Sequence, residues 1–187
     1  MGQPQIISGK PRILTRKEMA NDEKNQNCFY HHKYSALQRL KFFPFNQAKE
    51  IRLVSFAQPD SVITGGEIPM NKETVDTSKL IESRVVSPAD INILTDLLYN
   101  RGFRGPFYTH SRVLCYNPRN AILFLDQDGK VFAFIELGFE CDGHRLSSGK
   151  VKAGDFCNQK YDLLRTFFAT HGIKYGTNVD GDAVDEK

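Results

Sequence analysis

The clearest indication of the fold is the stretch AILFLDQDGKVFAFIEL, residues 121–137. Its two mostly apolar segments, 121–125 and 130–137, have the length of β-strands. The residues between them, 126–129, are typical of a tight turn, and Gly129 can take the left-handed backbone conformation that such turns need. The second run is apolar at odd and even positions alike, so both of its faces are expected to be covered. The stretch therefore predicts a hairpin whose second strand lies centrally in a sheet.

Two more strands and two helices flank this hairpin in the sequence. Residues 50–56 alternate polar and apolar side chains with a period of two, as a half-buried strand does, and 80–86 favour another strand. Residues 87–90, Ser-Pro-Ala-Asp, have the cap, the proline and the acidic residue that begin a helix. A last helix is predicted from a cap at Asp155 to Gly172. This order favours an α+β fold, a single mixed or antiparallel sheet with helices packed mainly on one face, over a doubly wound parallel sheet.

The 187 residues are enough for one domain of ordinary size. Residues 1–27 are polar and lack periodicity, so we interpret them as a flexible polar arm with at most one short ordered piece. A single α+β globular domain is expected over 28–174, with a long loop at 57–78, where glycines and prolines gather. The acidic residues of 175–187 predict a disordered tail.

Composition and charge narrow the class of protein. The net charge of +3 is mild, and we expect no nucleic-acid partner. No run approaches the roughly 20 apolar residues of a membrane helix, so a soluble protein without a membrane span is expected. The first residues contain no apolar leader, which favours a cytoplasmic protein. An exported lipoprotein is the alternative if a leader has been removed.

One charged residue falls inside the apolar hairpin. Glu136 interrupts an apolar face of the strand that is expected to be central. A buried carboxylate is costly without a partner, so we expect a cation or several hydrogen-bond donors beside it, and Arg119 is the natural candidate. Arg119 and Glu136 then form either a structural pair that fixes a loop onto the sheet or a ligand-binding site.

The chain has four cysteines, at positions 28, 115, 141 and 157. None forms a CxxC pair, and we expect all four to be reduced and structural. The alternative is a zinc site in which Cys115, Cys141 and Cys157 are joined by His144 or His110. A disulfide between Cys141 and Cys157 is a further alternative, and it would need an oxidising compartment.

A basic and aromatic stretch extends from residue 28 to residue 49. No acidic residue interrupts it, and phenylalanines and tyrosines alternate with lysines, arginine and histidines. Such a stretch can bind phosphate groups or stack on bases. More often the aromatic side chains belong to the core while the lysines face water, and this is the interpretation that we adopt.

Four short motifs follow one another in the middle of the chain: CYNPRNAILF at 115–124, DGKVF at 128–132, IE at 135–136 and FEC at 139–141. Together they resemble a group of small uncharacterised bacterial proteins, some of them exported as lipoproteins. The resemblance covers roughly residues 87–172 and implies no particular activity. Members of the group can have a second cysteine just before the FEC motif, where this chain has Gly138.

The sequence contains no phosphate loop, nucleophile elbow or zinc-protease motif. A well-specified core without a recognisable catalytic constellation favours a non-enzymatic protein that binds another protein, such as an accessory or immunity-like module. The alternative function is a zinc- or thiol-site protein that uses Cys115, Cys141 and Cys157. An enzyme acting through Arg119 and Glu136 has the least support.

Overall fold

The computed structural model describes residues 13–57, 67–108 and 116–177. Its main sheet has five strands in the order β5-β2-β7-β8-β9, and every neighbouring pair is antiparallel. These strands are β2 (Glu50–Phe56), β5 (Leu80–Val85), β7 (Asn120–Leu125), β8 (Val131–Gly138) and β9 (Gly143–Leu146). Two pairs of very short strands accompany them, β1 (Phe29–Tyr30) with β6 (Arg101–Gly102) and β3 (Met70–Asn71) with β4 (Thr74–Val75). The predicted α+β class with an antiparallel sheet is confirmed.

The hairpin of β7 and β8 lies where the sequence predicts it. β8 has neighbours on both edges, β7 and β9. Its two faces are both apolar because each packs in an apolar cluster, Ile135 on one face and Phe134 on the other. In the turn, the Asp126 carboxylate accepts hydrogen bonds from the backbone of Asp128 and Lys130, each at 2.9 Å. Gly129 has a φ angle of 75°, in the left-handed region that favours glycine. The turn residues therefore fix the register of the hairpin.

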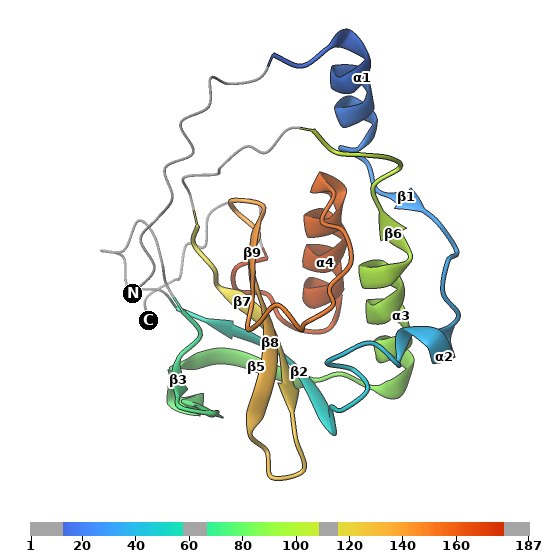
Figure 1. Ribbon diagram of the computed structural model, residues 1–187. Helices are drawn as coiled ribbons and strands as arrows, with labels where there is room; N and C mark the ends of the chain where they lie inside the picture. The colour runs from blue at the N-terminus through green and yellow to red at the C-terminus, as the bar shows by residue number, and fades with distance from the viewer. Residues whose placement is uncertain (1–12, 58–66, 109–115, 178–187) are drawn as a thin grey trace, which may run out of the picture.

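Two helices cover one face of the sheet, as Figure 1 shows. They are α3 (Pro88–Tyr99) and α4 (Asn158–Thr170). The buried side chains between sheet and helices include Leu53, Leu94, Leu98, Ile122, Ile135, Leu164 and Phe168. A smaller apolar cluster lies on the opposite face, under the β3–β4 hairpin, and includes Val54, Phe56, Ile68 and Leu123. The short helices α1 (Arg16–Lys24), α2 (Ala36–Arg39) and η1 (Thr77–Lys79) complete the described fold.

The helix starts confirm one prediction and correct another. Ser87 caps α3 through a hydrogen bond from the Asp90 backbone to its hydroxyl, at 3.2 Å. The N-cap of α4 is Cys157, which makes no side-chain capping bond, so the predicted cap at Asp155 is wrong. Asp155 lies two residues before Cys157, and its carboxylate accepts instead from the backbone of Phe103 at 3.3 Å.

The expected flexible arm contains an ordered helix. Helix α1 begins with a capping box of Thr15 and Glu18, a signal that the sequence interpretation overlooked. The helix is held to residues beyond α3 by polar contacts: Asn25 accepts from the Arg104 backbone at 2.8 Å, and buried Asp22 accepts from that of Tyr108 at 2.9 Å. Because these contacts are polar, they leave no apolar periodicity in the sequence. Residues 1–12 of the predicted arm lie outside the described ranges.

The ordered structure also continues past the predicted boundary at residue 174. Thr177 is buried, and the Tyr175 carbonyl accepts from the side chain of Asn120 at 2.9 Å. The predicted loop at 57–78 contains the β3–β4 hairpin and the start of η1 within its described part, 67–78. Over the ranges that the structure describes, no helix combines the length and apolar character needed to cross a membrane.

Candidate functional site

Glu136 is fully buried on β8, and it has three hydrogen-bond donors. Its carboxylate accepts from Arg145 Nε at 2.6 Å, from the Tyr116 hydroxyl at 2.9 Å and from the Ile68 backbone at 2.8 Å. Burial and the neighbouring Glu136 charge both raise the pKa of Tyr116, so its hydroxyl keeps its proton. The hydrogen bond to Glu136 likewise raises the pKa of Arg145. The carboxylate therefore anchors the Ile68 segment onto the sheet.

The predicted pairing of Glu136 with Arg119 is wrong. Arg119 instead forms an ion pair with Glu140, with 3.1 Å between Nη1 and Oε1, and its guanidinium lies over the Tyr175 ring. Arg145 takes the predicted place because it faces Glu136 directly across the β8–β9 pair. The sequence interpretation missed β9. A prediction of this short strand after Gly138 would have placed Arg145 opposite Glu136. The structure therefore does not bring the two predicted ligand-binding residues together.

The three cysteines that the structure describes are oxidised. Cys28 and Cys157 form a disulfide that joins the segment before β1 to the N-cap of α4, with 5.4 Å between the Cα atoms. Cys141 is disulfide-bonded as well, and no described cysteine is free. The expectation of reduced cysteines is wrong, and so is the alternative Cys141–Cys157 pair. Because Cys28 and Cys157 are 129 residues apart, no local pattern in the sequence indicates that they pair.

Of the residues predicted to bind zinc, the three that the structure describes make other contacts. The Cys157 and Cys141 sulfurs are in disulfides, while Cys115 and His110 lie outside the described ranges. His144 stacks on Phe156 with 3.7 Å between ring centroids, and its Nδ1 lies 2.8 Å from the Tyr161 hydroxyl. Burial, helped by the charge of Lys160, lowers the pKa of His144 to about 4. Within the described residues, no group of three metal-binding side chains comes together.

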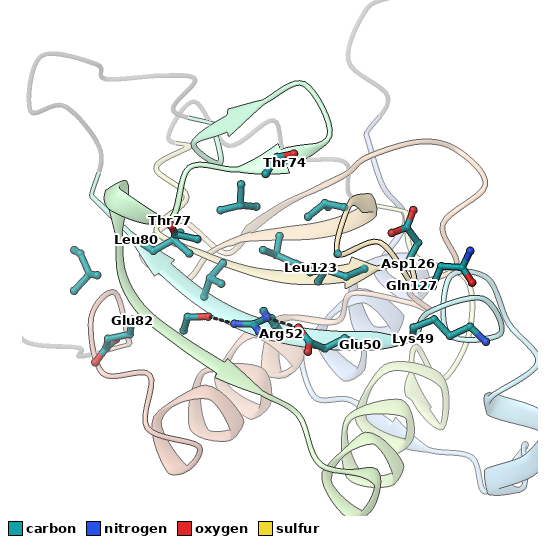
Figure 2. Close-up of a pocket in the computed structure, with 17 residues that line it drawn as sticks. Lys49, Glu50, Arg52, Thr74, Thr77, Leu80, Glu82, Leu123, Asp126 and Gln127 are labelled. Atoms are coloured by element: carbon teal, nitrogen blue, oxygen red, sulfur yellow. Dashed lines mark hydrogen bonds and ion pairs between the residues drawn. The ribbon is translucent and has the colours of Figure 1, made fainter.

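A groove lies on the sheet face that the helices leave open. It has a volume of about 770 Å³ and is bounded by β5, β2, the β7–β8 turn and the β3–β4 hairpin (Figure 2). Apolar side chains make up much of its lining, namely Val54, Val75, Leu80, Leu123, Leu125 and Val131. Charged side chains stand on its rim, where Arg52 pairs with Glu50 and donates to the Ser83 hydroxyl. The groove therefore combines apolar surface with many polar and charged groups, and both can contact a ligand.

The edge strand β5 borders this groove. It pairs with β2 on one side only, and no described strand pairs with its other edge. The Val86 backbone donates to the Ile51 carbonyl, and the alternation of an antiparallel ladder then turns the N–H and C=O groups of Ser83 and Val85 outward. Ile81 and Val85 are 48% and 56% exposed. The groove was not predicted, because its upper wall comes from residues interpreted as a loop.

The groove, the β5 edge and the Glu136 cluster thus lie on or beside one sheet, and they supply apolar surface and outward-facing backbone groups. Comparisons with known protein families, with curated proteins and with solved structures find no match to this chain.

Proposed function

We propose that this chain is a protein-binding module that takes up an extended segment of a partner protein along β5 and in the adjoining groove. The observation that carries the proposal is the conjunction of a strand edge that no described strand pairs, two exposed apolar side chains and an adjoining groove of about 770 Å³. An edge with outward N–H and C=O groups is a template for another strand.

The chemistry of the groove defines the segment that would fit. Ser83 and Val85 pair with Val54 and Arg52 in the ladder, so their side chains point toward the same sheet face as the groove. A bound strand would hydrogen-bond to the outward backbone of these two residues and place every second side chain against Ile81 and the apolar floor. The rim carries both signs of charge, with Lys49 and Arg52 against Glu50 and Asp126. The partner segment is therefore an extended strand with apolar residues at alternate positions.

One contact already occupies part of the edge. The Ser83 carbonyl accepts from the guanidinium of its neighbour Arg84 at 2.8 Å. Arg84 is exposed, so its side chain can move into water when a partner strand takes the carbonyl. Such a charged side chain on an edge strand is also a means of blocking uncontrolled pairing between copies. The edge is thus protected in the free protein and open to a partner that supplies its own backbone donor.

Selection of random linear peptides on the purified chain tests this function. We expect binders with alternating apolar residues whose affinity falls about tenfold or more, some 1.4 kcal/mol, in Ser83→Pro and in Ile81→Lys. Proline at position 83 removes one outward N–H, a change that an edge strand tolerates. Ile93→Lys is the matched control, because Ile93 on α3 is 49% exposed, close to the 48% of Ile81. Failure to select any binder, or binding that survives Ser83→Pro and Ile81→Lys, contradicts the proposal.

The Cys28–Cys157 disulfide supports an oxidising compartment for this module, in place of the cytoplasm that the sequence favoured. Disulfides persist outside the cytoplasm and are rare within it, where thiols are kept reduced. Alkylation of the protein immediately after lysis of its native cells, followed by mass measurement, tests the location. Cys28 and Cys157 should resist alkylation until a reductant is added. Immediate labelling of both would favour the cytoplasm.

A further inference from the structure

A second cavity, of about 530 Å³, lies at the junction of three segments that are far apart in the sequence. One wall comes from the residues after β1, another from the end of α3 and from β6, and the third from the loop before α4. In Figure 1 the pair β1–β6 marks this corner of the molecule. None of its lining residues belongs to the groove beside β5.

Positive charge dominates this cavity. Lys33, Arg101 and Lys152 line it, against a single carboxylate from Asp155. Within the described ranges, none of the three cations forms an ion pair, and Asp155 forms none either. The buried Nε of Arg101 has no hydrogen-bond partner there. Three cations without an anionic partner among the described residues, set against one carboxylate, favour an anionic ligand in this cavity.

Aromatic rings form the remaining wall of the cavity. Phe42 packs against Tyr34 and Tyr99, with ring centroids 5.0 Å and 4.8 Å apart, and Phe103 also lines the cavity. Aromatic side chains next to arginine and lysine are the combination with which proteins bind a planar ring that carries a phosphate. This surface belongs in part to the basic and aromatic stretch 28–49, whose aromatic rings therefore do more than fill the core.

The cavity is held in shape by buried contacts beneath it. Lys160 is fully buried, and its Nζ donates to the carbonyls of Leu98 and Arg101 at 2.7 and 2.6 Å. The Arg101 guanidinium lies over the Tyr30 ring, 4.9 Å from its centroid. Together with the disulfide between Cys28 and Cys157, these contacts fix the three walls relative to one another. A preformed site loses little free energy to ordering when a ligand binds.

We infer that this cavity is a second binding site, distinct from the protein-binding groove, for a small phosphate ester of an aromatic ring, such as a nucleoside monophosphate. The phosphate would lie among Lys33, Arg101 and Lys152, and the ring would stack on the Phe42–Tyr99 wall. The volume of about 530 Å³ is within the range of small-molecule sites. Asp155 limits the negative charge that a ligand can carry, because its carboxylate repels anions that approach the loop before α4.

Calorimetric titration of the purified chain with AMP, adenosine and inorganic phosphate tests the site. We expect AMP to bind with a Kd below about 1 mM, and each of its two parts to bind at least about tenfold more weakly. The variant Lys33→Met with Lys152→Met should weaken AMP binding about tenfold, since both lysines are exposed and can be replaced without loss of the fold. Lys41→Met is the control, because Lys41 is exposed in the same stretch and lies outside the cavity lining.

Three results would overturn the inference. The first is the absence of AMP binding at millimolar concentration. The second is AMP binding that the double lysine variant leaves unchanged, which would place the nucleotide elsewhere. The third is phosphate binding as tight as that of AMP, which would remove the role of the aromatic wall. None of these results bears on peptide binding at β5, so the two proposals fail independently.

Discussion

Removal of the Cys28–Cys157 disulfide should destabilise the whole domain rather than only the segment before β1. The bond joins two points 129 residues apart and reaches the fully buried sulfur of Cys157 at the start of α4. In the chain-entropy model, a cross-link over a loop of this length removes conformational entropy from the unfolded chain, which stabilises the folded state by about 5 kcal/mol at 25 °C. Removal of a native disulfide from a small domain typically lowers the free energy of unfolding by about 2–5 kcal/mol. We therefore expect a loss of about 3–5 kcal/mol.

The segment that the disulfide ties down has other attachments, and these set the lower limit of the effect. The backbone of Gln159 donates to Gln26 at 3.1 Å, and the backbone of Cys28 donates to the Gln159 side chain at 3.0 Å. Each such hydrogen bond contributes a net ~1 kcal/mol, so the segment stays docked only weakly once the bond is gone. The variant should therefore show local opening of residues 13–30 at denaturant concentrations below the main transition.

Urea denaturation of the variant Cys28→Ala with Cys157→Ala measures this effect. Circular dichroism follows the main transition, and limited proteolysis near Lys24 follows the local opening. The comparison is made without reductant, because Cys141 is also disulfide-bonded and must stay so in both proteins. A loss of less than about 1 kcal/mol, with the wild-type disulfide verified by mass, would refute the reasoning, since the bond would then add almost nothing to the contacts around it.

Three further predictions concern single side chains. Glu136→Gln removes the charge that faces Arg145 but keeps an oxygen that can accept from one donor. Because Arg145 is partly exposed, we expect the free energy of unfolding in urea to fall by about 1–3 kcal/mol. An unchanged stability would show that the ion pair is unimportant. Burial lowers the pKa of His144 to about 4, so between pH 6.5 and 4 the unfolded chain binds a proton at this residue and the folded chain does not. Stability should therefore fall as the pH drops from about 6.5 to 4, and thermal unfolding of His144→Gln should show a smaller fall over that range. An equal fall in both proteins would contradict the argument. Gly154→Ala should cost about 3 kcal/mol or more, because φ is 69° and a Cβ would overlap the Leu98 carbonyl, whereas Gly129→Ala, with φ 75° and open space around it, should cost only about 1 kcal/mol in the same assay.

The parts of the fold that could be predicted are those with local, periodic causes. The β7–β8 hairpin follows from its turn and its apolar runs, and the start of α3 follows from Ser87 and Pro88. The sequence interpretation failed where long-range pairing decides the structure. Helix α1 does have a local signal, the capping box of Thr15 and Glu18, but its docking depends on polar contacts to residues about 80 positions away, such as the hydrogen bond between Asn25 and Arg104, which no local pattern indicates.

The same distinction separates what was predicted of the site from what was not. Local sequence predicted that Glu136 needs a cation, because any carboxylate inside an apolar strand does. It named Arg119 and missed Arg145, because the observed pair depends on β9, a strand of four residues whose pairing with β8 places Arg145 opposite the carboxylate. The groove beside β5 is likewise made by segments that meet only after folding. Both proposed binding sites therefore lie at junctions between distant segments; the basic and aromatic stretch 28–49 indicated one wall of the second cavity, but no motif indicated how the walls meet.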